Sequence, residues 1–175
     1  VTANQDINIA TAGGSLADAG TPTLTSGTGM SINLGAGDGQ LDAVIAGAGG
    51  VTKDGAGTLR FQGSDANTYS GTTTINEGTL ELAKTAGTNA IAGNVTIGDG
   101  TGGADADVLQ LVNSNQIANT STVSIASSGL FDLTDPDTTT DLSETVARLT
   151  GTGSVDFGMN STNTLTVGDG TSFIV

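Results

Sequence analysis

The stretch GAGTLRFQGSDANTYSGTTTINEGTLELA, residues 55–83, decides the fold of this 175-residue chain. It holds a glycine-flanked apolar segment, a polar turn with one tyrosine, a threonine-rich segment and a second glycine-flanked apolar segment. The tripeptide GTL at residues 57–59 returns at residues 78–80. This offset falls within the spacing of about 20 to 25 residues between equivalent strands that is typical of a solenoid in which each turn is one supersecondary unit.

Short segments in which apolar and polar residues alternate recur along the chain. Gly, Asn or Asp bounds each of them, which predicts short β-strands with one dry face and one wet face. In the opening stretch we expect Leu59, Phe61, Ile75, Leu80 and Leu82 to point inward, and Thr72, Thr74, Thr79 and Glu81 to face solvent. The predicted strands are TLRF (58–61), TTTIN (72–76), TLEL (79–82), NVTI (94–97), VLQLV (108–112), TVSI (122–125), SVDF (154–157) and TLTV (164–167).

Other internal similarities extend the repeat beyond that stretch. VTIGDGT (95–101) returns as LTVGDGT (165–171), an offset that predicts a separation of about three turns. AGAGGV (46–51) and TGTGSV (150–155) share one glycine frame, and SGTGMSINLG (26–35) is a third variant of it. Helix signals are almost absent. The best helix candidate is a single turn in DLSETVARLTG (141–151), which Asp141 or Ser143 could cap.

These periods predict an all-β solenoid of about seven coils with three short strands per coil. Stacking of coils about 4.8 Å apart gives each strand hydrogen-bonded neighbours and closes a narrow apolar column. Glycine suits the corners, where a sharp bend needs positive φ. Asparagine suits the same corners because its side chain can bond local backbone. The asparagines expected at corners are Asn67, Asn76, Asn89, Asn94 and Asn113.

Composition excludes several classes of function. The net charge is −14 and only Lys53, Arg60, Lys84 and Arg148 are basic, so nucleic acid and anionic membrane surfaces are poor partners. The chain has no cysteine and no histidine, which excludes thiol chemistry, Ser-His-Asp triads and the usual zinc and copper sites. No apolar run approaches the length of a membrane helix, so we expect no direct membrane insertion by this segment.

The residues of the opening stretch resemble the autotransporter-associated β-strand repeat, a passenger-associated repeat of large bacterial surface proteins. Phe61 stands where that repeat usually has an aliphatic residue. The resemblance implies a right-handed parallel β-helix, export to the cell surface, and a structural or adhesive role. The positions that carry it are Gly55, Gly57, Thr58, Leu59, Gly63, Asn67, Tyr69, Gly71, Thr72 or Thr73, Ile75, Gly78, Leu80 and Leu82.

The resemblance is specific over residues 44–100 and looser over residues 101–170. We therefore divide the chain into residues 1–25, which form a lead-in or a first coil, and residues 26–175, which form the β-helix repeat segment. The apolar SFIV at the end shows no closing cap. We accordingly expect the chain to be an internal piece of a longer passenger.

Three acidic, glycine-rich corners are candidates for calcium, which binds carboxylate and carbonyl oxygens on loops. They are residues 35–42, 98–107 and 132–141. The second corner comes nearest to the calcium-binding nonapeptide pattern and supplies Asp99, Asp105 and Asp107, but tandem copies are missing. Solvated acidic turns are the alternative that we favour, with no metal and no cofactor.

We expect no enzyme and assign no catalytic residue. The only dense acidic group, Asp132, Asp135, Asp137 and Asp141, surrounds Pro136 in an apparent insertion without a nearby Arg or Lys. Sugar-binding clefts also offer aromatic platforms, and this chain holds one Tyr and four Phe. Tyr69 is expected to pack over a corner rather than to bind a ligand.

The sequence thus predicts a rigid display rod or spacer of an exported, extracellular bacterial surface protein. Two alternatives stay open: an adhesin module that binds a surface glycan or host protein, and a filament subunit that associates end to end.

Overall fold

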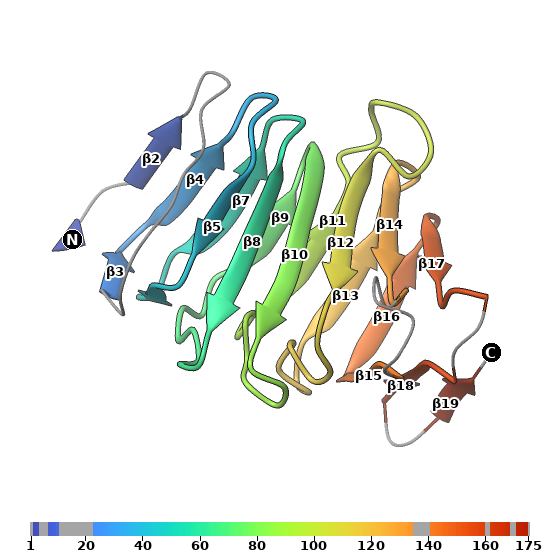
Figure 1. Cartoon of the computed structure of the whole chain (residues 1–175). Helices are drawn as coiled ribbons and strands as arrows, with labels where there is room; N and C mark the ends of the chain where they lie inside the picture. Colours follow the sequence, from blue (N-terminus) through green and yellow to red (C-terminus); the bar gives the residue numbers. More distant parts are fainter. Residues whose placement is uncertain are drawn as a thin grey trace.

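The chain forms a solenoid of parallel β-strands in the computed structural model (Figure 1). The structure describes residues 2–3, 7–10, 23–134, 141–159, 162–168 and 171–174, with the backbone alone for 2–3, 7–10 and 171–174. No helix occurs in this part of the chain, and consequently none that could span a membrane. The predicted all-β solenoid is confirmed.

Two long sheets make up two faces of the solenoid. The first sheet has seven strands in the order β16-β13-β11-β9-β7-β4-β2. Its strands are β2 (Ile7–Ala10), β4 (Gly29–Asn33), β7 (Gly50–Asp54), β9 (Thr73–Ile75), β11 (Val95–Ile97), β13 (Thr122–Ile125) and β16 (Arg148–Gly151). The second sheet has six strands in the order β17-β14-β12-β10-β8-β5. Its strands are β5 (Gly39–Leu41), β8 (Thr58–Gly63), β10 (Gly78–Lys84), β12 (Asp107–Leu111), β14 (Gly129–Asp132) and β17 (Ser154–Asp156).

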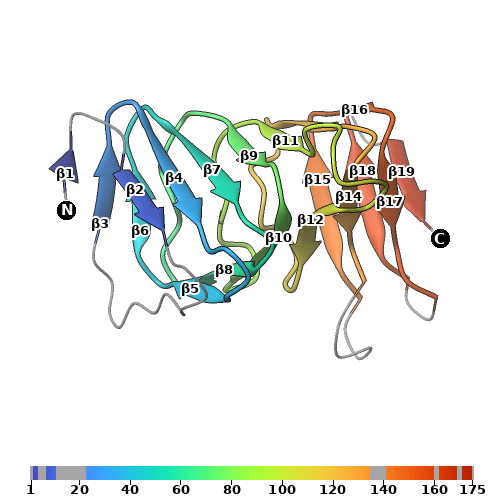
Figure 2. The ribbon, with the colours of Figure 1, turned by 90° about the horizontal axis from the view of Figure 1, so that it is seen from above.

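The third face is less regular than the two long sheets. It has two three-stranded sheets, β1-β3-β6 and β15-β18-β19. Its strands are β1 (Thr2–Ala3), β3 (Thr23–Ser26), β6 (Val44–Ala46), β15 (Ser143–Val146), β18 (Thr164–Val167) and β19 (Thr171–Ile174). Between the two sheets run segments at residues 67–70, 89–92 and 115–118, joined by backbone bonds such as Thr68 N to Ile45 O and an isolated bridge from Ile91 to Ile117. Figure 2 shows the turns following one another from the N-terminal to the C-terminal end.

Register between turns follows the repeat read from the sequence. Leu59 of β8 pairs with Leu80 of β10, so the two copies of GTL lie one turn apart. Gly29 pairs with Gly50 in the same way, which confirms the likeness between residues 26–35 and 46–51. The five inward residues predicted for the opening stretch are all at most 1% exposed.

The core is a set of in-register columns along the solenoid axis. The columns of the second sheet are Leu59, Leu80, Leu109, Phe131 and Val155, and Leu41, Phe61, Leu82 and Leu111. The columns of the first sheet are Met30, Val51, Thr73, Val95, Val123 and Leu149, and Ile32, Lys53, Ile75, Ile97 and Ile125. Side chains of one column contact those of the turns above and below, so each turn needs its neighbours to bury its apolar surface.

Two of the sequence similarities predicted equivalent positions in the solenoid, and in both cases the similar segments lie on different faces. Residues 95–97 belong to the first sheet, but their counterpart at 165–167 lies in β18 on the third face. Likewise Val51 lies in the first sheet and Val155 in the second. Loops of different length intervene, so the paired residues Ile97 and Ile125 lie further apart in sequence than the paired residues Leu59 and Leu80. Equal spacing in sequence therefore does not give equal position around the turn.

The solenoid has about six turns, and the expected count of about seven coils stays a prediction. The handedness of the winding stays a prediction. The division of the chain after residue 25 also stays a prediction, although β1 pairs with β3 and β2 pairs with β4.

The helical turn expected in residues 141–151 is wrong. This segment forms β15 and β16, because Leu142, Glu144 and Val146 alternate with exposed or half-buried neighbours and all three are buried. The expectation that the chain is an internal piece of a longer passenger stays a prediction. Strand β19 folds back on β18, and this pair is antiparallel, unlike the other strand pairs of the described residues.

Candidate functional site

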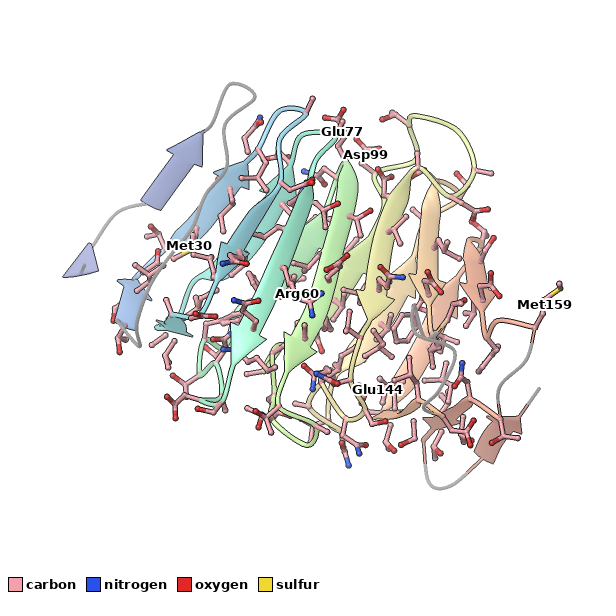
Figure 3. The ribbon with its side chains drawn as sticks, viewed as in Figure 1. Met30, Arg60, Glu77, Asp99, Glu144 and Met159 are labelled. Atoms are coloured by element: carbon pink, nitrogen blue, oxygen red, sulfur yellow. The ribbon has the colours of Figure 1, made fainter. Side chains whose placement is uncertain are left out.

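An acidic hollow of about 520 Å³ lies at the corner where three successive turns pass from the first sheet to the second. Its carboxylates are those of Asp54, Glu77, Asp99 and Asp107, and Asn76 and Thr101 add further polar atoms. Glu77 and Asp99 lie beside each other at one end of the strands in Figure 3.

Stacking of the turns brings these residues together. Asp54 ends β7, Glu77 follows β9, and Asp99 lies in the loop after β11. Because β7, β9 and β11 are neighbours in the first sheet, their carboxyl ends meet at one edge. Asp107 begins β12, the second-sheet strand that the loop after β11 leads into.

Hydrogen bonds hold two of the carboxylates in place. Asn76 Nδ2 donates to Asp54 Oδ1 at 2.9 Å, which links two turns. Asp99 Oδ1 accepts from the Thr101 N–H at 2.8 Å and from the Thr101 hydroxyl at 2.7 Å. These two bonds favour the charged form and lower the pKa of Asp99.

Asp107 differs from the other three because it faces inward. It is 1% exposed and stands in register between Gly78 and Gly129, which have no side chains to fill its place. Burial raises its pKa, against bonds from the Ser128 side chain and the Asp99 backbone. Its Oδ2 atom has no hydrogen-bond partner in the part of the chain that the structure describes. A buried carboxylate oxygen without a partner is costly and is uncommon in folded proteins.

The nearest cation is Lys53, a buried member of an interior column. Its ammonium donates to the carbonyl oxygens of Asp54 at 3.1 Å, Gly55 at 2.5 Å and Glu77 at 2.9 Å. Burial lowers the pKa of Lys53 to about 8, while the charges of Glu77 and Asp54 act in the opposite direction. An ammonium has three donors, so these carbonyls use all of them and leave none for Asp107.

The predicted calcium residues are only partly brought together. Asp99 and Asp107 line the hollow, whereas Asp105 is exposed in the same loop with φ of 57° and does not line it. Within the described ranges, no three carboxylates lie close enough together to form a metal cluster by themselves. The favoured interpretation of these three residues as solvated acidic turns stays a prediction, and so does the calcium alternative.

The other two acidic corners lie elsewhere. In the first, Asp38 Oδ1 accepts from the Thr58 N–H at 2.9 Å, which ties the corner to the next turn. In the third, Asp132 belongs to β14 and Asp141 accepts from Thr162. Asp135 and Asp137 lie outside the described residues.

Three polar members of the hollow, Asp54, Asn76 and Glu77, were missed from the sequence, and so was the burial of the nearby Lys53. The signal was available, because the offset that places Lys53 beside Ile75 also places Asp54 beside Asn76. The sequence showed Lys53 only as one of four basic residues, and its burial was not expected because lysine is rarely buried.

The outer faces of the two long sheets are candidate binding surfaces. One hydroxyl per turn is aligned along the first sheet, in the row Ser31, Thr52, Thr74, Thr96, Ser124 and Thr150. The second sheet carries Arg60, whose Nη1 lies 2.8 Å from Glu81 Oε2, with Gln110 and Asp132 following in register. Tyr69 belongs to neither surface: it is 1% exposed and its hydroxyl bonds Thr73, so the predicted packing role is confirmed.

Comparison with known proteins supports the resemblance seen in the opening stretch. Residues 51–82 match the family described as Passenger-associated-transport-repeat. The Adhesin BmaC autotransporter of Brucella suis biovar 1 (strain 1330) is 37% identical over 81 residues, which cover 46% of this chain and 2% of that protein. The chain thus spans a small fraction of the relative's length. No solved structure matches the chain. The predicted autotransporter passenger repeat is confirmed for residues 51–82.

Proposed function

We propose that this chain is a non-enzymatic, rigid spacer within the exported passenger of a bacterial surface protein. The observation that carries the proposal is the continuous register of the two long sheets, which runs through about six turns. Each internal strand bonds to the turn before it and the turn after it. Bending or stretching the segment would therefore break many backbone bonds together.

Buried polar side chains strengthen the third face, where the strands are short. Asn67 is 3% exposed, and its Oδ1 accepts from the Ile45 N–H at 2.9 Å while its Nδ2 donates to the Ala90 carbonyl at 2.7 Å. One side chain thus joins the turn before it to the turn after it, instead of bonding local backbone as expected. Such bonds replace the backbone ladder where it is interrupted.

The matched family and the relative support a location at the cell surface. The family description and the relative's name both speak of passengers and autotransporters. An acidic, solvated exterior with a net charge of −14 fits a segment that stays soluble outside the cell.

An adhesive function is the second candidate, and one specific observation favours it: the relative's name includes adhesin. The flat outer faces described above offer rows of hydroxyl and charged groups that a glycan or a host protein could contact. End-to-end association with a second copy is the third candidate. The exposed edges of the long sheets would carry it.

Surface display separates these functions. The chain would be placed in one or two tandem copies between a surface anchor and a fluorescent tag, and the height of the tag above the membrane would be measured. A spacer of about six turns adds about 30 Å per copy. Cells that display it should bind host cells and glycans no better than cells that display an unrelated spacer of equal length. A constant tag height would contradict the spacer, and a gain in binding would favour the adhesin.

A further inference from the structure

We propose that the acidic hollow binds a divalent cation of the calcium–magnesium class that keeps part of its water shell. The buried Oδ2 of Asp107 would be the inner contact, and Asp54, Glu77 and Asp99 would hold the outer waters. This inference does not rest on the proposed function.

The donor set points to a hard cation. The polar side chains among the lining residues are four carboxylates, one threonine hydroxyl and the amide of Asn76. Calcium and magnesium prefer such oxygen ligands, whereas zinc and copper prefer nitrogen and sulfur.

Charge at the hollow is unbalanced. Four carboxylates line it, and the single ammonium nearby has its three donors engaged with backbone carbonyls. The Oδ2 of Asp107 is therefore left without a donor, in a buried side chain that lines the hollow. A cation would satisfy that oxygen and relieve the repulsion among the four carboxylates at once.

The size of the hollow explains why the cation keeps water. No three carboxylates of the described chain lie within reach of one bare ion. A volume of about 520 Å³ holds an ion with several waters, since one water takes about 30 Å³. Magnesium in particular is held by one or two carboxylates and its own waters. An organic cation fits less well, because no aromatic ring lines the hollow to face it.

Titration calorimetry and thermal melting test the proposal on the full chain at about pH 8. Calcium chloride, magnesium chloride and sodium chloride of matched ionic strength would be compared. We expect one saturable site for at least one of the two divalent ions, with a dissociation constant of about 0.1–1 mM, and a melting shift that sodium does not give. Which of the two ions binds more tightly decides between calcium and magnesium.

Asp107→Asn is the decisive variant, because it removes the charge at nearly constant volume. We expect its affinity to fall at least tenfold. The matched control is Asp105→Asn, which removes the same charge from the same loop at a residue outside the hollow and should leave affinity within about twofold. Asparagine also tolerates the positive φ at that position.

Glu77→Gln keeps the test decisive if the Asp107 variant fails to fold by circular dichroism. Its affinity should fall severalfold, because it removes one of the outer carboxylates. Three results would overturn the proposal: no saturable binding of either ion up to about 10 mM, equal shifts with sodium, or equal losses in the Asp105 variant and in the hollow variants. In the first case a proton or water alone satisfies Asp107, and in the other two the ions act through the general negative charge of the chain.

Discussion

Replacing Glu144 by glutamine should change how the stability of the chain depends on pH. Glu144 is 1% exposed in β15 on the third face, away from the hollow (Figure 3). Its Oε2 accepts from the N–H groups of Gln116 at 2.7 Å and Ile117 at 3.1 Å, and its Oε1 accepts from the Thr145 N–H at 2.9 Å. Burial nevertheless outweighs these bonds and raises the pKa from 4.5 to about 7.

The direction in which the free energy of unfolding changes with pH follows from proton linkage. Between the unfolded pKa of 4.5 and the folded pKa of about 7, the folded state binds more protons than the unfolded state. The contribution of Glu144 is therefore fully present below the unfolded pKa and is lost as pH rises through about 7. A difference of about 2.5 pKa units corresponds to about 3 kcal/mol.

Glutamine is neutral at every pH. Its amide has one acceptor oxygen, so it can accept the hydrogen bonds that one of the two carboxylate oxygens accepts in the wild type. The variant loses the Thr145 bond, which costs about 1 kcal/mol. Relative to the wild type, however, it should gain about 3 kcal/mol as pH rises from about 4 to about 8. The variant is thus expected to be the less stable protein in acid and the more stable one at about pH 8.

Urea unfolding followed by far-ultraviolet circular dichroism at a series of pH values measures this difference. Glu81→Gln is the matched control for the loss of one negative charge, because it removes that charge from the outer face of the second sheet. A constant difference between wild type and Glu144→Gln across the series would refute the account of a buried, raised carboxyl. A difference of opposite sign would refute it as well.

Three further variants test the packing. Leu80→Ala, in the middle of an interior column, should lose about 2–5 kcal/mol of unfolding free energy in urea melts, whereas Thr79→Ala next to it on the outer face should lose less than about 1. Asn67→Ala leaves one buried N–H and one buried carbonyl without partners and should cost about 2–4 kcal/mol by the same assay. Gly57→Ala would place a methyl 1.8 Å from a carbonyl oxygen of the preceding turn and should melt well below Gly100→Ala, where nothing lies within 4 Å and only the positive φ opposes the change. Equal losses within either matched pair, or an Asn67 variant as stable as the wild type, would contradict the stacking.

The sequence predicted the regular part of the fold because alternation and glycine spacing report local geometry. Leu59 and Leu80 are in register since identical tripeptides recur one turn apart. The sequence did not predict the register where a loop changes the length of a turn, as between Ile97 and Ile125. The length of a loop leaves no periodic pattern of apolar residues from which it could be read.

Buried polar residues were the other failure. Lys53, Glu144 and Asn67 are stabilised by backbone groups of neighbouring turns, and those partners become visible only when the turns are stacked. For the same reason, only two of the four carboxylates that line the hollow were candidates from the sequence. Asp99 and Asp107 stand in one glycine-rich segment, whereas Asp54 and Glu77 come from two earlier turns.

Distance measurement between two spin labels tests the stacked-turn account most directly. The chain has no cysteine, so Thr52→Cys and Thr150→Cys can be labelled without other changes. These residues are far apart in sequence but belong to one row of the first sheet, four strand spacings apart through Thr74, Thr96 and Ser124. Pulsed electron paramagnetic resonance should give a narrow distribution centred at about 19 Å between backbones, before allowance for the label arms. A broad distribution, or a centre beyond about 35 Å, would contradict the solenoid.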